Sequence, residues 1–302
     1  MKILYGVQGT GNGHITRARH MAKALNQRSD VTVDFFFSGR CAAQYFDMDV
    51  FQDYSTARGL TFKTDKGKIQ YTKTVTQNNL CQFVRDIRKT IITDYDVVVN
   101  DFEPVTAWAA KLSGVPSISV SHQAAFLHRV PKHQQGIIDR VVTKYFAPTD
   151  VNLGTHWYHF GHEIIPPFIS CELKQYARTQ QATAEEYLVY LPFEPIDVIR
   201  DQLHILSEHK FICFHPSIQV AEKDKNIHWQ PLSTHTFTSY LVTCSGVISN
   251  SGFELSTECL ALGKPLLMKP LKGQQTIWWS QVLKQNPQSS ETTKRVWAVR
   301  DW

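Results

Sequence analysis

Residues 2–27 read KILYGVQGTGNGHITRARHMAKALNQ, an apolar run followed by a loop with three glycines and then by a second periodic stretch. The apolar run predicts a buried strand, because it is short and is bounded by glycine. From Ile15 onward, apolar residues recur at helical spacing, with Ala18 and Leu25 on the same side. The stretch therefore predicts a strand, a tight loop and a helix over 14–27, in that order.

The same alternation of strand and helix continues along the chain. Further strands are expected at 30–39, 96–101, 116–122, 187–193, 210–216, 246–249 and 264–270, and further helices at 80–91, 104–114, 195–206 and 251–263. Strands that alternate with helices over short connections favour parallel sheets covered by helices. The fold class is therefore α/β, and the opening strand, loop and helix indicate a Rossmann-like sheet.

A break in this pattern divides the chain. Residues 164–186 contain two adjacent prolines and then a polar run without apolar periodicity. A chain of 302 residues also has the length of about two domains. We therefore expect an N-terminal Rossmann-like domain over 1–165, a linker over 166–186 and a C-terminal Rossmann-like domain over 187–302.

Composition restricts the class of protein. Hydrophobic residues make up 42% of the chain and charged residues 20%, which indicates a globular protein. The net charge of +5 is too small and too dispersed for a nucleic-acid partner. Six cysteines without a CxxC pair, and no run of 18 apolar residues, favour a cytoplasmic protein with free, mostly buried thiols. Peripheral contact with an anionic membrane surface stays an alternative.

The glycine loop QGTGNGH has two functional interpretations and one structural one. Glycines between a strand and a helix let backbone N–H groups approach an anion, and the helix N-terminus favours negative charge. A dinucleotide site would have the spacing GxGxxG and an acid about 20 residues later. Here Gly9, Gly11 and Gly13 are spaced GxGxG, and no acid ends the next expected strand. The loop therefore favours a phosphate or sugar over a dinucleotide, and a tight turn capped by His14 is the structural alternative.

A second informative stretch, GVISNSGFELSTECLALGKPLLMKPLKGQQ, covers residues 246–275. Small polar residues stand where its helix is expected to begin, and Gly252 allows a ligand to approach the backbone. Free N–H groups at that helix terminus can bind a diphosphate. Glu258, six residues later, is placed to accept hydrogen bonds from ribose hydroxyls. The alternatives are a solvated first-turn acid for Glu254 and an exposed helix face for Glu258.

Three stretches resemble one family. SNSGFELSTECLALGKPLLMKP (249–270) resembles the donor-binding motif of nucleotide-sugar glycosyltransferases with the GT-B fold, and QGTGNGH resembles their N-terminal glycine loop. NDFEPVTAWAAKLSGVPSISVSHQ (100–123) is similar to a stretch in the branch that contains the bacterial N-acetylglucosaminyltransferase forming lipid II. The stretches lie in the family's order and in both halves of the chain.

The resemblance implies two Rossmann-like domains that face each other across a cleft, the first binding the acceptor and the second the nucleotide sugar. The residues that it implies on the acceptor side are Gly11, Asn12, Gly13 and His122. On the donor side it implies phosphate contacts at Ser251 and Gly252, a ribose contact at Glu258 and a sugar contact near Gln274 or Gln275.

Two departures from the family pattern limit these implications. Relatives commonly carry an acid–glutamine pair where this chain has Gln275-Thr276-Ile277, so the motif does not define the donor sugar. Such chains usually end with a helix that crosses back to the first domain, and residues 286–302 are short and polar for that purpose. The second domain is therefore expected to be shortened at its end.

Glycosyl transfer needs a base at the acceptor hydroxyl and stabilisation of the leaving phosphate. His14 is the first candidate base, because a helix N-terminus favours a neutral imidazole that can accept a proton. Asp101 and Glu103 follow an expected strand and are the next candidates, with a cap of helix 104–114 as their alternative. His122 ends another strand, and a buried structural histidine is its alternative.

The sequence thus predicts a glycosyltransferase of the hexosyltransferase type that inverts the sugar and uses a nucleotide-diphosphate donor, UDP-linked, without a metal or further cofactor. The acceptor is undefined, and a lipid-linked acceptor is one alternative. Because fold does not define chemistry, a nucleotide-sugar epimerase or hydrolase on the same fold is a second hypothesis. A non-catalytic nucleotide-binding or nicotinamide-binding α/β protein is the third.

Overall fold

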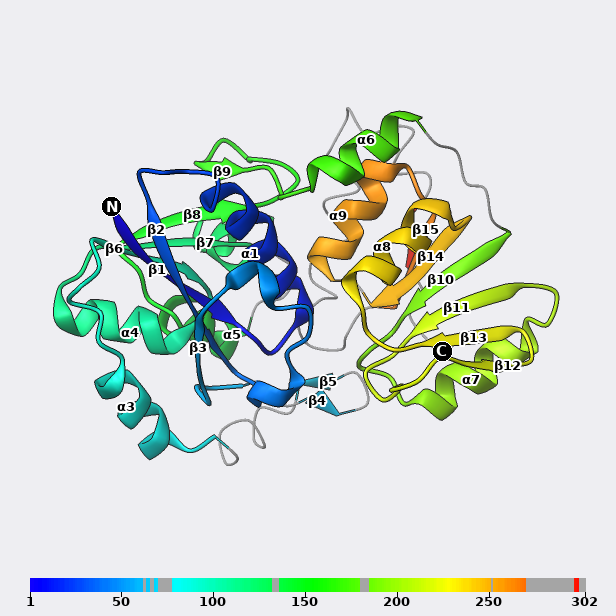
Figure 1. Ribbon diagram of the computed structural model, residues 1–302, viewed down its shortest axis with the longest axis horizontal. Helices are drawn as coiled ribbons and strands as arrows, with labels where there is room; N and C mark the ends of the chain where they lie inside the picture. Colours follow the sequence, from blue (N-terminus) through cyan, green and yellow to red (C-terminus); the bar gives the residue numbers. More distant parts are fainter. Residues whose placement is uncertain are drawn as a thin grey trace. The chain divides into compact units, whose positions relative to one another are not determined.

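Two parallel sheets, each covered by helices, organise the chain in the computed structural model (Figure 1). The structure describes residues 1–61, 64–65, 68–69, 78–131, 136–179, 185–250, 252–269 and 296–298. By their internal contacts the residues form a first unit, 1–63 with 70–168, and a second unit, 64–69 with 169–302.

The sheet of the first unit has seven strands in the order β3-β2-β1-β6-β7-β8-β9, and all neighbours run parallel. Their bounds are β1 Lys2–Gln8, β2 Thr32–Ser38, β3 Tyr54–Ala57, β6 Val97–Asp101, β7 Ser117–Ser121, β8 Val151–Thr155 and β9 Ile164–Ile165. The order changes direction between β1 and β6. Ligands of open α/β sheets bind beyond the carboxyl ends of the strands at such a point.

Helices cover both faces of this sheet, because successive strand residues point to opposite faces and both sets are apolar. In α1 (Asn12–Leu25), Ile15 packs against Tyr5 of β1 and against the other apolar strand residues that point to the same face of the sheet. α4 (Pro104–Ser113) packs Val105 against Leu4 on the other face. The remaining elements of the unit are α3 (Leu80–Lys89), α5 (Ile137–Tyr145) and the 3-10 turns η1 (Ala42–Gln44), η2 (Asp49–Phe51) and η3 (Gln123–Leu127).

The second unit repeats this plan in the order β12-β13-β11-β10-β14-β15-β16, with only β12 antiparallel to its neighbour among the described strands of this sheet. Its strands are β10 Glu186–Tyr190, β11 Lys210–Phe214, β12 Glu222–Asp224, β13 Ile227–Gln230, β14 Gly246–Asn250, β15 Leu266–Lys269 and β16 Val296–Ala298. Its helices are α6 Cys171–Thr179, α7 Ile196–Ile205, α8 Thr234–Thr243 and α9 Phe253–Leu262, and β4 (Thr64–Asp65) pairs with β5 (Lys68–Ile69). The order changes direction between β10 and β14.

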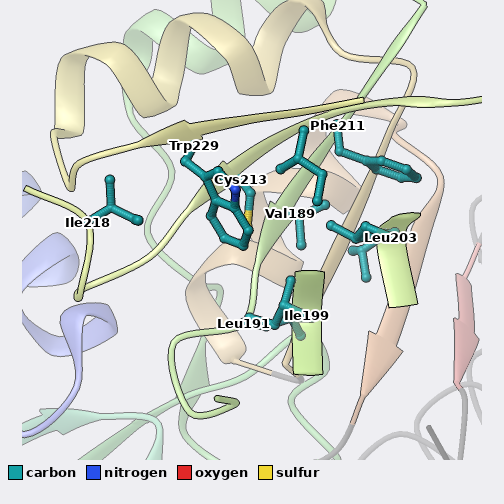
Figure 2. Close-up of a cluster of buried hydrophobic side chains, with 10 residues drawn as sticks. Val189, Leu191, Ile199, Leu203, Phe211, Cys213, Ile218 and Trp229 are labelled. Carbon is teal, nitrogen blue, oxygen red and sulfur yellow. The ribbon is translucent and has the colours of Figure 1, made fainter. Parts of the chain in front are cut away.

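Figure 2 shows the apolar core on one face of the second sheet. Cys213 of β11 and Trp229 of β13 are fully buried there against Ile199 of α7. The alternate residues of these strands point to the other face of the sheet. There the ring centroids of Tyr190 and of Phe237 on α8 lie 5.5 Å apart. The second sheet is thus buried on both faces, which explains its near-continuous apolar strands.

The expected α/β class with two parallel sheets is confirmed, and three details differ from the sequence expectation. α1 begins at Asn12 and not at His14, so the histidine lies inside the first turn. α8 is a helix that the sequence did not predict: its many β-branched and aromatic residues have a low helix propensity, and its burial against the sheet overrides that preference. α6 lies within 166–186, the segment expected as a linker, and the expected domain boundaries stay a prediction.

All six cysteines are free thiols, and the expectation that most are buried is wrong for half of them. Cys41, Cys81 and Cys171 are exposed. In the part of the chain that the structure describes, no helix is long and apolar enough to span a bilayer.

Candidate active site

The glycine loop after β1 is held against the end of β2. Gly9 N–H donates to the Ser38 carbonyl oxygen over 2.5 Å, and a Cβ on Gly9 would lie only 2.3 Å from the Tyr45 hydroxyl. Arg40 donates to the Gly9 carbonyl oxygen and, over 2.9 Å, to Oδ1 of Asn12. Residue 9 must therefore be glycine for the loop to lie this close to β2.

Gly11 has a different surrounding. A Cβ on Gly11 would meet only Cδ2 of His14, at 4.0 Å, among the described residues. Gly11 is the N-cap of α1, and Asn12 and Gly13 form its first turn. The absence of a side chain at Gly11 therefore keeps space beside the His14 imidazole open to a ligand.

His14, Asp101 and Arg17 form a cluster where the sheet order changes direction. Nδ1 of His14 lies 2.8 Å from Oδ1 of Asp101, which ends β6. Arg17 donates to both carboxylate oxygens, from Nε over 2.8 Å and from Nη2 over 2.7 Å. The side chains of Asp101 and Arg17 are 0% and 2% exposed, whereas that of His14 is 15% exposed. Only the imidazole of this cluster is therefore open to a substrate.

The charges of this cluster define the tautomer of His14. Burial acts to raise the pKa of Asp101, but the charges and hydrogen bonds of Arg17 and His14 outweigh it and hold that pKa below its ordinary value of 3.8. The ionised carboxylate can only accept, so Nδ1–H of His14 donates to it. The 3.2 Å contact of Nδ1 with Nη2 of Arg17 is longer and joins two donors. The lone pair of His14 therefore lies on Nε2, the atom that can accept a proton.

Glu103 is fully occupied as the cap of α4. Its carboxylate accepts from the N–H groups of Val105 and Thr106 over 2.8 and 2.7 Å, and from the hydroxyls of Thr106 and Ser38 over 2.6 and 2.5 Å. Burial raises the pKa of Glu103 against the effect of these hydrogen bonds. Four donors use the acceptor sites of both oxygens. This geometry supports the capping alternative and favours His14 over Glu103 as the base.

His122 is a buried neutral histidine at the end of β7. Its Nδ1 lies 2.8 Å from the carbonyl oxygen of Thr155 and donates to it. Burial and the neighbouring His156 lower the pKa of His122 well below its ordinary value of 6.5, and burial lowers the pKa of His156 to about 4. Both imidazoles are therefore neutral near pH 7, which fits the structural alternative for His122.

Sequence reasoning missed two residues that contact His14. Arg17 lies one helical turn after the histidine, a spacing that places both on one face of a helix and could have identified the pair. Gln123, the first residue of η3, brings its amide Nε2 to 3.5 Å from Nε2 of His14. This second contact joins residues 109 apart, and no local sequence signal indicates it.

The second unit places the expected donor-binding turn after β14, next to the point where its strand order changes. Gly252 is the N-cap of α9, and a Cβ on Gly252 would meet nothing within 4 Å among the described residues. As the N-cap residue, Gly252 has no side chain that could cap this helix terminus. Ser251, Gln274 and Gln275, the other expected donor contacts, lie outside the described residues.

Glu258 lies two turns into α9 and is half-buried, and Glu254 in the first turn is buried. The expectation of a solvated Glu254 is therefore wrong. Burial and the charge of Glu254 raise the pKa of Glu258 to about 8. Two carboxylates one turn apart disfavour double ionisation unless a ligand supplies hydrogen-bond donors.

An ion pair that sequence reasoning missed joins two strand ends of the second unit. Nζ of Lys269, at the end of β15, lies 2.6 Å from Oε2 of Glu194, which follows β10. The carbonyl oxygen of Glu194 accepts from Nε2 of His215, which follows β11. Within the described ranges, no group of three or more His, Cys, Asp or Glu side chains is placed to hold a metal ion.

Solved structures with a similar fold are glycosyltransferases. The glycotransferase of kitacinnamycin is 12% identical, with a TM-score of 0.58 over 99% of this chain and 86% of that one. UGT2 of Phytolacca americana, complexed with UDP-2fluoro-glucose and pterostilbene, is 13% identical, with a TM-score of 0.57 over 100% and 85%. SnogD from Streptomyces nogalater is 13% identical, with a TM-score of 0.51 over 90% and 82%. These likenesses define the fold, two Rossmann-like domains of the GT-B class.

The family follows from the sequence match. The profile described as "Glycosyl transferase family 1" matches residues 1–286, so the chain belongs to this glycosyltransferase family. No curated protein sequence matches the chain.

Proposed function

We propose that this chain transfers a sugar from a nucleoside-diphosphate donor to a hydroxyl group of an acceptor, with inversion and without a metal ion. The observation that supports the proposal is the 2.8 Å contact between His14 and Asp101, where the strand order of the first sheet changes direction. Asp101 is buried and pairs with Arg17. The contact leaves Nε2 of a partly exposed imidazole as a proton acceptor. A general base in that position is what an attacking hydroxyl requires.

The chemical step needs one displacement. The acceptor O–H donates its proton to Nε2 of His14 while the oxygen attacks the anomeric carbon, and the bond from that carbon to the diphosphate oxygen breaks. Asp101 stabilises the imidazolium that forms, because its carboxylate already accepts from Nδ1–H. A single displacement inverts the configuration at carbon, which is the basis of the inverting assignment.

The donor is assigned to the second unit. The N-terminus of α9 favours the developing charge on the leaving diphosphate, and Gly252 keeps that terminus open. Ser251, Glu258, Gln274 and Gln275 are the other proposed donor contacts. The likeness of residues 100–123 to the lipid II-forming branch makes UDP-N-acetylglucosamine the first donor to test and a lipid-linked hydroxyl the first acceptor class.

The experiment is a donor screen followed by product analysis. Thermal shift with UDP, GDP, dTDP and NAD identifies the nucleotide, because a ligand that binds only the folded state raises Tm. Mass spectrometry of reactions with and without a panel of hydroxyl acceptors, each with and without EDTA, then identifies the reaction. Stabilisation by NAD alone would overturn the proposal. Sugar release that ignores the acceptor would assign a hydrolase, and loss of transfer with EDTA would overturn the metal-independent mechanism.

Glu258→Gln is expected to weaken binding of the nucleoside diphosphate by about 1–3 kcal/mol, because the amide removes a charged acceptor for the ribose hydroxyls. Since the pKa of Glu258 is raised to about 8, wild-type affinity is expected to increase with pH until the carboxylate is ionised. Calorimetric titration with UDP between about pH 6 and 9 measures both effects.

The stability of the unliganded protein provides an independent check on Glu258. Its pKa is raised from 4.5 to about 8 on folding, so its stabilising contribution is present below pH 4.5 and is lost as pH rises toward 8. Glu258→Gln should remove this part of the pH dependence. Glu208→Gln, at an exposed turn of the same unit, is the matched control and should change neither measurement. Equal UDP affinity in wild type and Glu258→Gln at every pH would assign Glu258 to a structural role.

A further inference from the structure

Gln123 is a polar side chain of the first unit that the mechanism above does not use. It begins η3, directly after β7, and its amide Nε2 lies 3.5 Å from Nε2 of His14. Within the described residues, its Oε1 is buried and has no hydrogen-bond partner. The amide therefore stands beside the reactive nitrogen with its hydrogen-bonding capacity almost unused.

The distance of 3.5 Å is too long for a good hydrogen bond between the two nitrogens. It does allow one hydroxyl oxygen to lie within hydrogen-bond distance of both. Such an oxygen would accept from the Gln123 N–H and donate its own proton to His14 Nε2. The two side chains differ in role at this point, because the amide nitrogen can only donate and the neutral Nε2 can only accept.

We propose that Gln123 binds the acceptor's reactive hydroxyl group together with His14, and that its N–H stabilises the negative charge that develops on the oxygen as the proton leaves. The proposal rests on the proposed sugar transfer and adds the ligand contact of a residue to which no role is assigned above. A hydrogen bond to a charged oxygen is stronger than one to a neutral hydroxyl, so the contact strengthens in the transition state.

The same geometry gives Gln123 a second effect on His14. An N–H of Gln123 that faces Nε2 opposes a proton on that nitrogen, because two donors would then meet. Among the described residues, Asp101 from β6 and Arg17 from α1 also contact the imidazole, and the neutral His122 at the end of β7 interacts with it electrostatically. Between the two neutral tautomers, Asp101 selects the one with the proton on Nδ1, and an N–H of Gln123 that faces Nε2 favours the same tautomer.

Two near-isosteric variants test the proposal. Gln123→Met removes the donor and is expected to lower kcat roughly 10–100-fold, with the KM of the donor sugar unchanged. Gln123→Glu replaces the donor with an acceptor that favours a protonated imidazole, so the acidic limb of the pH–rate profile should move to higher pH by about one unit or more. NMR of the His14 ring nitrogens should show the same displacement without any substrate. Gln82→Met, which removes an amide that donates to Asp86 on α3, is the matched control.

The outcomes separate this proposal from the proposed function. A wild-type protein that transfers sugar, together with a folded Gln123→Met of wild-type kcat, overturns the role of Gln123 and leaves sugar transfer intact. If Gln123→Met does not fold, Gln123→Glu tests the proposal instead. A pH–rate profile of Gln123→Glu whose acidic limb lies at the wild-type pH would overturn the proposal. If wild type transfers no sugar from any donor, the proposed function fails, and the proposal about Gln123 fails with it.

Discussion

His14→Ala is expected to lower kcat by about 10²–10⁴-fold and to leave nucleotide affinity close to that of wild type. The large effect follows from the loss of the only group in the cluster that is both open to a substrate and able to accept a proton. Asp101 is fully buried and paired with Arg17, so it cannot replace the imidazole. Steady-state kinetics and UDP titration on the same preparation measure the two quantities.

The control for His14 is His209→Ala. His209 is exposed and precedes β11 in the second unit. It therefore lies at the amino end of that strand, whereas ligands of such sheets bind beyond the carboxyl ends. Its loss should leave kcat unchanged. A His14→Ala protein that turns over at the wild-type rate would contradict the assignment of His14 as the base.

Asp101→Asn is expected to lower kcat by about 10²–10⁴-fold, comparable to the loss of the base itself. An amide at this position can donate to Nδ1 of His14, which favours the tautomer with the proton on Nε2. The imidazole would then present a donor to the acceptor hydroxyl and could not remove its proton. NMR of the ring nitrogens distinguishes this tautomer change from a loss of structure. An unchanged tautomer with unchanged kcat would contradict the role of Asp101.

The same carboxylate also stabilises the fold. Asp101→Ala removes the carboxylate that pairs with the buried guanidinium of Arg17, a change expected to cost about 3–5 kcal/mol in the free energy of unfolding. Since the pKa of Asp101 is below its ordinary value of 3.8 in the folded protein, this stabilisation is present above pH 3.8 and is lost as pH falls below it. Urea denaturation at several pH values measures it. Asp150→Asn, which weakens two hydrogen bonds with Ser117 at the opposite strand edge, should leave kcat unchanged.

Much of the fold could be predicted because its signals are local. The apolar run of β1, the glycines after it and the periodicity of α1 lie within 27 residues, and strand–helix alternation of this kind permits few topologies. α8 shows the limit of that reasoning. Its threonines, phenylalanine and tyrosine favour a strand by propensity, whereas the Ser233 cap and the packing of Phe237 against Tyr190 stabilise the helix.

The sequence alone placed His14 at a helix start, Asp101 at a strand end and Gly252 before α9, because each position is determined by the helix or strand next to it in the sequence. It could not choose between base and cap for Asp101 and Glu103, which stand two residues apart and follow the same strand. The tertiary structure gives the two carboxylates different surroundings, since β1 and β6 are hydrogen-bonded neighbours although about 90 residues separate them. That pairing brings Asp101 to His14 and Arg17, and it leaves Glu103 facing Ser38 and the first turn of α4. Contacts between distant residues depend on strand order, and strand order is a property of the folded sheet.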